Sequence, residues 1–193
     1  HKLISGYPEG RRMWLNIKWY QGGTLVREDG AYGDITVDIG GTPTVVRSLL
    51  DPDDPNLITF ETHHGMTREW AAQLLTYGLP ASLPLGYDRL TGDVTETLAG
   101  LAAQAPGSTL ETFHFVLNDT VLKDTRIPPY GFRYDDGFER NALPVPDSQY
   151  GDPGPGGVYD HWAWQPLDVP AGATSATLEL LYQPTSWEYV QFL

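Results

Sequence analysis

The sequence contains no cysteine among its 193 residues. This absence excludes a disulfide, a thiolate-ligated zinc or iron–sulfur centre and a cysteine nucleophile within the chain. It also excludes a haem attached covalently to this stretch through a Cys-x-x-Cys-His motif. Because no cysteine is present, its usage gives no information on the redox compartment.

Positive charge is also scarce. The chain has 12 Lys and Arg residues against 25 Asp and Glu residues, which gives a formal net charge of −13 at pH 7. So acidic a chain is a poor partner for nucleic acids and for anionic lipid surfaces. No apolar run is long enough to cross a bilayer, so we expect no membrane span.

Turn-forming residues are abundant instead, with 21 glycines and 16 prolines. The hydrophobic fraction of 40% is nevertheless too high for a disordered chain. The length suits one domain with its own core, so we predict a single domain over residues 1–193. Because the chain begins with His1 rather than Met, we expect it to be either processed or part of a longer protein.

Several short segments are typical of β-strands. They are residues 14–20, 24–27, 35–39, 57–62, 113–117 and 176–182, most of which alternate apolar and polar side chains. The paired glycines Gly22 and Gly23 suit a hairpin turn between the first two, because glycine tolerates a positive φ. Short strands and frequent turns together predict a mainly β fold, a β-sandwich of Ig-like or jelly-roll-like type.

One or two short helices and long loops are expected to interrupt the strands. Residues 67–77 are the strongest helix candidate, because Thr67 can cap the helix and Trp70 and Leu74 share one face. A weaker candidate covers residues 93–104, where two acidic residues have the spacing of a capping box. The glycine- and proline-rich residues 127–157 predict long surface loops.

The internal histidines lack the spacing of a metal site. His63 and His64 are adjacent, so in an extended segment they point to opposite sides, and we interpret both as ordinary surface or loop residues. We expect His114 on the polar face of its strand and His161 in a loop. Both are more typical of hydrogen-bonded structural residues than of metal ligands.

Two features could still bind a cation. If His1 is a mature N-terminus, its amine and imidazole could chelate copper as in histidine-brace oxygenases, with His114 or His161 as the second histidine. The alternative is that His1 only marks where a fragment begins. The acidic loop 51–56 offers oxygen ligands for Ca²⁺ but lacks the glycine and glutamate of an EF-hand, so a solvated loop is favoured.

Patterns for catalysis are missing. The chain has no Gly-x-Ser-x-Gly, no phosphate-binding loop and no dinucleotide fingerprint, and we predict that it is not an enzyme. The charged residues 123–126 run into Pro128 and Pro129, which force an extended exit. We interpret them as the end of a strand whose Lys, Asp and Arg pair with each other or with loop carbonyls, although a surface for docking a neighbouring domain is the alternative.

Four segments form an ordered set of motifs along the chain. They are residues 1–3 with 6–15, residues 61–62 with 65–67, residues 113–132, and residues 181–189. The first is similar to Gly-His-Lys-Leu-Pro-Thr-Gly-Tyr-Pro and the last to Tyr-Gln-Thr-Thr-Ser-x-Glu-Tyr. The third is similar to Phe-His-Phe-Val-Leu-Asn followed by Lys-Asp-Asn-Arg-Ile-Pro-Pro-x-Gly-Phe. In these motifs the chain resembles the β-rich domain of many multihaem c-type cytochromes.

The resemblance has three departures. Ile4 and Ser5 replace Pro-Thr, and Thr125 replaces Asn, neither of which alters the domain assignment. Residues 79–110 have no counterpart in the family pattern, so the resemblance says nothing about their role.

The resemblance implies the C-terminal, haem-free β-domain of an extracytoplasmic multihaem c-type cytochrome, acting in periplasmic or extracellular electron transfer. It also implies that His1 is an axial ligand to a haem c held by another segment or chain. The implied partners are the haem-bearing module or subunit and further copies in an assembly.

Three hypotheses follow for function. The first is the non-catalytic accessory domain of a cytochrome, and the second is a copper-dependent oxygenase that uses His1 as a histidine brace. The third is a carbohydrate-binding or cell-surface adhesion module, which the sandwich fold and the 23 aromatic residues suit. Cys-x-x-Cys-His motifs upstream of His1, bound copper, and binding to polysaccharide would separate the three.

Overall fold

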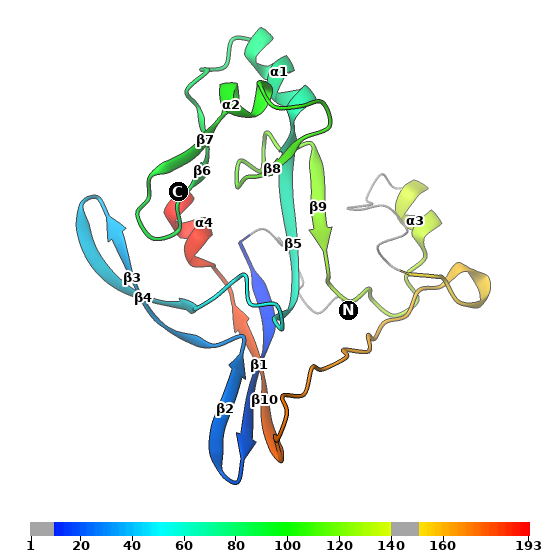
Figure 1. Cartoon of the computed structure of the whole chain (residues 1–193). Coiled ribbons are helices and arrows are strands. Elements are labelled where there is room, and N and C mark those ends of the chain that lie inside the picture. Colours follow the sequence, from blue (N-terminus) through cyan, green and yellow to red (C-terminus); the bar gives the residue numbers. More distant parts are fainter. Residues whose placement is uncertain (1–9, 140–150) are drawn as a thin grey trace.

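A long central strand, β1 (Arg12–Gln21), organises the chain. The computed structural model describes residues 10–139 and 151–193 (Figure 1). On one side β1 pairs antiparallel with β10 (Ser175–Gln183) along the whole of that strand. Side chains of β1 are buried on both of its faces, among them Trp14, Ile17 and Trp19, which is why this strand lies in the interior of its sheet.

The other edge of β1 is shared by two strands. The second half of β1 pairs with β2 (Thr24–Asp29), and its first four residues pair with β5 (Ile58–Thr67). The turn between β1 and β2 is the predicted one, with φ of 57° at Gly22 and 87° at Gly23.

The remaining strands continue this antiparallel arrangement. β5 pairs further along with β9 (Thr120–Asp124) and β8 (Thr109–Glu111). Two separate hairpins are β3 (Tyr32–Ile39) with β4 (Thr42–Leu49), and β6 (Pro84–Tyr87) with β7 (Val94–Thr97).

The far end of β5 leads into a helical lobe. This lobe contains α1 (Arg68–Thr76), α2 (Leu98–Ala102) and the β6–β7 hairpin (Figure 1). Its hydrophobic cluster is formed by Met66, Ala71, Leu74, Leu85, Leu98 and Leu101, all buried. As predicted, Thr67 caps α1, because its hydroxyl accepts a hydrogen bond from the Trp70 N–H at 3.1 Å.

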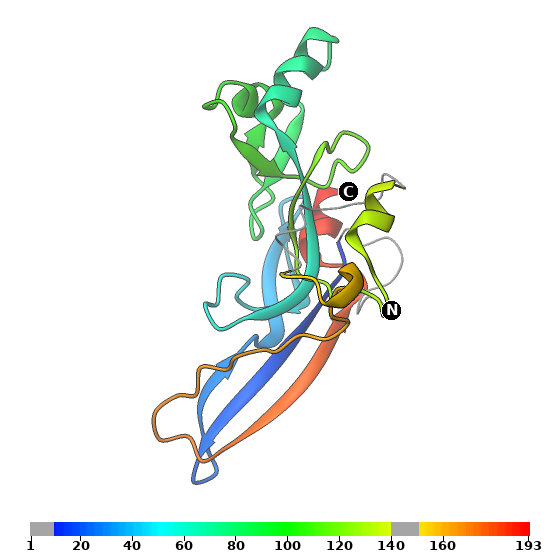
Figure 2. The ribbon, with the colours of Figure 1, turned by 90° about the vertical axis from the view of Figure 1, so that its right-hand side faces the viewer.

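The last third of the chain is loop-rich. It contains α3 (Tyr134–Glu139), the 3-10 helix Pro155–Gly157 and, after β10, the short helix α4 (Trp187–Phe192). The long loop before β10 runs beside the arm formed by β1, β2 and β10 (Figure 2). Within residues 10–139 and 151–193, no helix is long and apolar enough to cross a membrane.

The mainly β, sandwich-like fold class is confirmed, with curled antiparallel sheets. Residues 10–139 and 151–193 contain four short α-helices, more than the one or two expected. The helix predicted over residues 67–77 is also confirmed, as α1. The helix predicted over 93–104 is wrong in extent, because residues 94–97 form β7 and only 98–102 are helical. Thr97 rather than an acidic residue caps this helix, by accepting from the Gly100 N–H at 3.2 Å.

The strand predicted over residues 113–117 is wrong. The carbonyl of His114 accepts hydrogen bonds from the N–H groups of Leu117 and Asn118, at 2.7 and 3.0 Å, which closes a turn. Phe113 packs edge-on against Tyr189 of α4, with ring centroids 5.4 Å apart, instead of joining a sheet. A contact with a distant part of the chain therefore overrides the local alternation of apolar residues.

Candidate functional site

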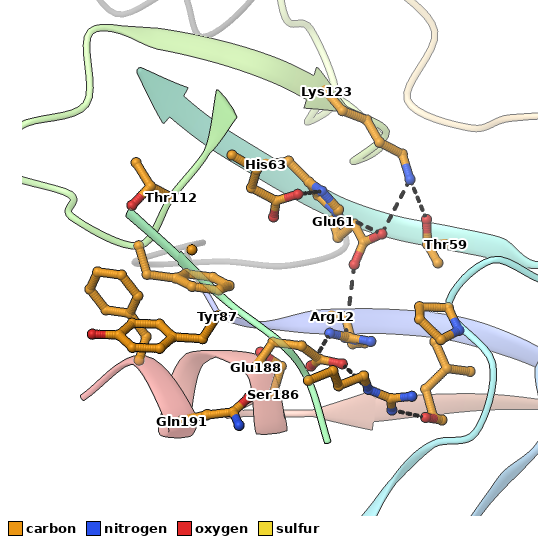
Figure 3. A pocket seen from close by; sticks show the side chains of 18 of the residues that line it. Arg12, Thr59, Glu61, His63, Tyr87, Thr112, Lys123, Ser186, Glu188 and Gln191 are labelled. Atoms are coloured by element: carbon orange, nitrogen blue, oxygen red, sulfur yellow. Dashed lines mark hydrogen bonds and ion pairs between the residues drawn. The ribbon is translucent and has the colours of Figure 1, made fainter. Parts of the chain in front are cut away.

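A cleft of about 620 Å³ lies beside β5 (Figure 3). Its lining combines residues of β1 and α4 with residues of β6 and of the segment that follows β8. The charged side chains that define its chemistry are Arg12, Glu61, His63, Arg89, Glu111, Lys123 and Glu188. These residues come from segments far apart in the chain, so the cleft lies where separate parts of the fold meet.

The register between β1 and β5 places Arg12 opposite Glu61. Both residues are buried, at 9% and 7% exposure, and Arg12 Nε lies 3.9 Å from a carboxylate oxygen of Glu61. Opposite charges in directly paired positions stabilise an antiparallel sheet. A one-residue slip would move Glu61 to the other face of the sheet, so the pair also favours this register.

The guanidinium of Arg12 extends this pair towards α4. Its Nη2 donates to a carboxylate oxygen of Glu188 at 2.7 Å, and Arg89 Nε donates to the other oxygen at 2.7 Å. Arg89 also donates to the carbonyls of Leu49 and Leu50 at the end of β4. Glu188 thus joins β1, α4 and the loop after β6 through two charge-assisted hydrogen bonds.

His63 lies on the other side of Glu61. Its Nε2 is 2.9 Å from Glu61, and its Nδ1 is 2.8 Å from Glu111 of β8. Because ionised carboxylates only accept hydrogen bonds, both ring nitrogens donate and the ring is an imidazolium. Burial lowers the pKa of His63, but hydrogen bonds and charge attraction from Glu111 and Glu61 outweigh burial and raise it to about 9.

Glu61 is correspondingly held in its ionised form. Burial would raise its pKa, but His63, Arg12 and Lys123 together lower it to about 2. The Lys123 ammonium lies 3.2 Å from Glu61 and 3.1 Å from the hydroxyl of Thr59. We name the alternating series Arg89, Glu188, Arg12, Glu61, His63 and Glu111, with Lys123 attached, the ionic ladder.

The ionic ladder is suited to holding elements together rather than to transferring protons. A general base works best when its pKa lies near the operating pH. His63 stays protonated at neutral pH, and the pKa of Glu61 is shifted downward. The ladder connects β1, β5, β8, β9 and α4, so its chemistry is that of a structural clamp.

Aromatic rings close one end of the cleft. Phe192 of α4 contacts Tyr87 of β6 edge-on, with ring centroids 5.6 Å apart, and Phe113 at 5.9 Å. Phe113 also packs on Tyr189. Edge-to-face pairs of this kind add to the stabilisation from burial itself. The C-terminal helix is therefore attached to the rest of the chain by both charge and aromatic packing.

The expectation that His63 and His64 are ordinary surface or loop residues is wrong. Both belong to β5, and a register shift between them accommodates the pairing with β9. His63 is part of the ionic ladder. Burial, followed by the charge of Arg126, lowers the pKa of His64, so its surroundings favour the neutral ring.

The other histidines occupy different places. His114 lies in a turn and not on a strand, with Nε2 2.8 Å from the carbonyl oxygen of Pro84 and its ring 4.6 Å from that of Phe192. His161 lies in a loop, as expected, with its ring 5.0 Å from that of Tyr130. His1, the predicted axial ligand or copper chelator, lies outside the described residues.

The acidic loop 51–56 uses its carboxylates within the fold. Asp51 accepts from the N–H of Asp53, and Asp54 accepts from the N–H groups of Asn56 and Gly30. These bonds match the interpretation of the segment as a loop with local turns. Within the described ranges, no group of three or more His, Asp or Glu side chains is arranged to hold a metal ion.

The charged residues 123–126 form the predicted strand end. Asp124 and Arg126 are buried and make a two-pronged ion pair, with the Arg126 Nε donating to Asp124 at 2.7 Å. Lys123 pairs with Glu61, outside its own segment. The interpretation of this segment is therefore confirmed for Asp124 and Arg126 and wrong for Lys123, which pairs with β5 instead.

Sequence reasoning did not single out Arg89 or Glu111 as members of a site. The pair Glu61 and His63 carries a usable signal, because residues two apart on a strand share a face. Arg89 carries no such signal, since its position depends on how residues 79–110 fold against α4.

Comparison with known proteins gives no relative. No family matches the chain, and neither a curated protein nor a solved structure is significantly similar to it.

Proposed function

We propose that this chain is a non-catalytic accessory domain of an extracytoplasmic multihaem c-type cytochrome. The observation that carries the proposal is that the four motif segments with this resemblance meet at one place. Arg12 belongs to the first segment, Glu61 to the second, Lys123 to the third and Glu188 to the last. All four are members of the ionic ladder.

The convergence gives these motifs a physical reason to occur together. Arg12 contacts Glu61 and Glu188, Glu61 contacts Lys123, and Phe113 of the third segment packs on Tyr189 of the last. A chain that keeps one member of such a buried network needs the others, because an unpaired buried charge is costly. Contacts of this kind stabilise a fold and do not define a reaction. Their presence in the four motif segments therefore supports a shared domain fold rather than a shared activity.

The charge state of the ionic ladder favours a structural role for this domain over a catalytic one. Its carboxylates are neutralised by Arg12, Arg89, Lys123 and protonated His63, which leaves its charges engaged with each other. Residues 79–110, which lack a counterpart in the family pattern, supply α2 and the β6–β7 hairpin of the helical lobe. We infer that this part of the lobe is an insertion relative to the family pattern.

The proposed partner is a haem-bearing module that carries haem c on its own Cys-x-x-Cys-His motifs. The chain has no cysteine, so it cannot attach haem c covalently and would contribute only an imidazole as an axial ligand. The resemblance implies that this ligand is His1. The proposed location is the periplasm or the cell exterior, where such cytochromes act.

The coding sequence on the 5′ side of the His1 codon, together with natively purified protein, tests this proposal. We expect several Cys-x-x-Cys-His motifs and the absorption spectrum of low-spin haem c. In the intact protein, His1→Ala should convert one haem from low to high spin, whereas the control His161→Ala should not. A signal-peptidase site directly before His1 and one bound copper per chain would overturn the proposal in favour of a copper oxygenase.

A second candidate function, carbohydrate binding, is favoured by one surface feature. Trp162 and Trp164 are 48% and 85% exposed on the loop before β10, with their rings 5.7 Å apart. Exposed aromatic side chains in such proximity often mark a binding surface. Retention of the chain on neutral polysaccharide beads, and loss of retention in Trp164→Ala, would support this function over the first.

A further inference from the structure

The outer edge of β10 stands free in the part of the chain that the structure describes. β10 is the terminal strand in its sheet and pairs only with β1 there. Figures 1 and 2 show β1, β2 and β10 extending together as an arm away from the helical lobe. An edge strand presents a row of backbone N–H and C=O groups that can pair with another strand.

This edge lacks the usual features that prevent pairing. The register with β1 runs from Ser175 to Gln183 without a shift, so β10 has no bulge. The strand contains no proline, and Glu179 is its one charged residue. Natural proteins commonly protect exposed edges with bulges, prolines or several charges. β10 is therefore long, regular and weakly protected.

One face of β10 is also apolar and exposed. Leu178, Leu180 and Tyr182 are 53%, 47% and 52% exposed and lie at every second position. In the sheet, Leu178 is paired with Ile17 of β1, which is only 2% exposed. The apolar surface that is buried on β1 thus continues outward to β10, where it ends in solvent.

We propose that a second copy of this chain pairs with this edge, β10 to β10, in an antiparallel dimer with Leu180 at the two-fold axis. In this register Leu180 lies opposite Leu180 of the second copy. Leu178 lies opposite Tyr182 of the second copy, so the apolar face becomes continuous across both molecules. Such an interface is isologous, with the same surface contributed by both partners.

The charge of Glu179 and the position of Tyr182 together favour this register. A two-fold axis at Glu179 would place the two carboxylates directly opposite each other, which is unfavourable. Moving the axis to Leu180 places Glu179 opposite Leu181 and still aligns residues 177–183 of both strands. Moving it one residue further shortens the overlap to residues 179–183. An axis at Leu178 avoids the repulsion with an equal overlap, residues 175–181, but leaves Tyr182 outside the pairing. Leu180 is therefore the axis that combines the longest such overlap with pairing of the whole apolar stripe.

The dimer should be weak and strengthened by salt. An interface one strand pair wide falls at the low end of the areas that specific complexes bury. Each copy carries a net charge of −13, so the two copies repel each other until salt screens them. The proposal is independent of the proposed cytochrome context, because it concerns only the chain itself.

Sedimentation of the 193-residue chain from micromolar to millimolar concentration tests the association. We expect the dimer fraction to rise with concentration and, at fixed concentration, with added salt. Leu180→Lys should abolish the dimer, because it places two like charges opposite each other at the axis. Val45→Lys, a similar change at an exposed apolar position of β4, should leave the dimer intact.

Single-cysteine variants test the register, since the chain has no other thiol. In the proposed dimer, residues directly opposite at the axis have Cα atoms about 4.5–5.5 Å apart, within reach of a disulfide. Leu180→Cys should therefore form a disulfide-linked dimer under mild oxidation. In Leu178→Cys the two thiols would be about 14 Å apart along the strands, so that variant should remain unlinked.

The proposal would be overturned by a monomer at all concentrations and salt levels. It would also be overturned if Leu180→Lys and Val45→Lys dimerised alike, or if Leu178→Cys and Leu180→Cys were crosslinked at equal rates. Circular dichroism and the urea midpoint of each variant would show that the monomer remains folded. Leu180 and Val45 are both exposed, so neither substitution should unfold it.

Discussion

β5 passes through two regions that are stabilised in different ways. In its middle, Glu61 and His63 belong to the ionic ladder, whose contacts join five elements of the fold. At its far end, Met66 is fully buried in the hydrophobic cluster of the helical lobe, with Leu98 and Leu101. One strand therefore carries two kinds of core only a few residues apart.

The two regions should respond differently to change. Apolar burial contributes roughly 25 cal/mol per Å² and does not depend on the titration of side chains. A buried ion pair has a small net value, because desolvation offsets the attraction, yet removing one partner leaves the other charge unpaired. The lobe should therefore be sensitive to lost volume, and the ladder to lost charge and to pH.

Glu61→Gln should have the largest effect of the substitutions considered. It removes the carboxylate that Arg12, His63 and Lys123 share, and we expect a loss of about 3–5 kcal/mol from the free energy of unfolding in urea at neutral pH. Glu179→Gln on exposed β10 is the matched control and should change stability by less than about 0.5 kcal/mol. Equal costs for the two variants would mean that the ladder does not stabilise the fold.

Leu101→Ala should cost somewhat less, about 2–4 kcal/mol, through a cavity in the helical lobe. Its control is Leu25→Ala on β2, where the side chain is 48% exposed and little apolar area is lost. Because the residues that form the hydrophobic cluster with Leu101 carry no titratable side chain, its cost should be the same at mildly acidic and mildly alkaline pH. A cost that changed with pH would contradict the expectation that only the ionic ladder responds to titration.

Local pattern was enough to predict much of the fold. The alternation in β1 and the capped apolar face of α1 are set by neighbouring residues, and both elements formed as expected. Residues 113–117 have the same alternation, yet they form a turn because Phe113 packs on α4. The local alternation of apolar and polar residues cannot predict packing against a helix at the other end of the chain.

The candidate site was less predictable for the same reason. Glu61 and His63 share a strand face, so their proximity follows from the period of two. Arg12 joins them only through the register of β1 with β5, and Arg89 only through the fold of residues 79–110. The motif segments contained four members of the ladder, but nothing local indicated that these four would meet.

His63 should make stability depend on pH in the alkaline range. Its pKa is about 9 in the folded chain against 6.5 for a free histidine, so its contribution is fully present below pH 6.5. That contribution is lost as the pH rises through 9. With allowance for partial exposure, the loss should be about 2 kcal/mol in urea unfolding.

His63→Gln should flatten this part of the profile, and Leu101→Ala should leave its shape unchanged. His64 does not produce this fall, because its pKa is lowered in the folded chain, which makes stability rise rather than fall as the pH increases through about 6.5. A His63→Gln profile that still fell between pH 6.5 and 9 would contradict the placement of an imidazolium between Glu61 and Glu111.

The helix caps of the two regions provide the smallest and most discriminating test. Ser186 caps α4, which presents Glu188 to the ladder, and Thr97 caps α2 in the lobe. Either hydroxyl accepts one backbone N–H bond, at 3.3 and 3.2 Å, so Ser186→Ala and Thr97→Ala should each cost about 1 kcal/mol.

When each cap variant is combined with Glu61→Gln, the costs in unfolding free energy should differ between the two caps. Without Glu61, Arg12 depends on Glu188 alone, so a frayed α4 should cost more than in the native chain. We expect Ser186→Ala with Glu61→Gln to exceed the sum of the single costs by at least about 0.5 kcal/mol, and Thr97→Ala with Glu61→Gln to be additive. If both pairs were additive, the ladder would be a series of independent contacts. Coupling confined to the Ser186 pair would mean that its charges act as one unit.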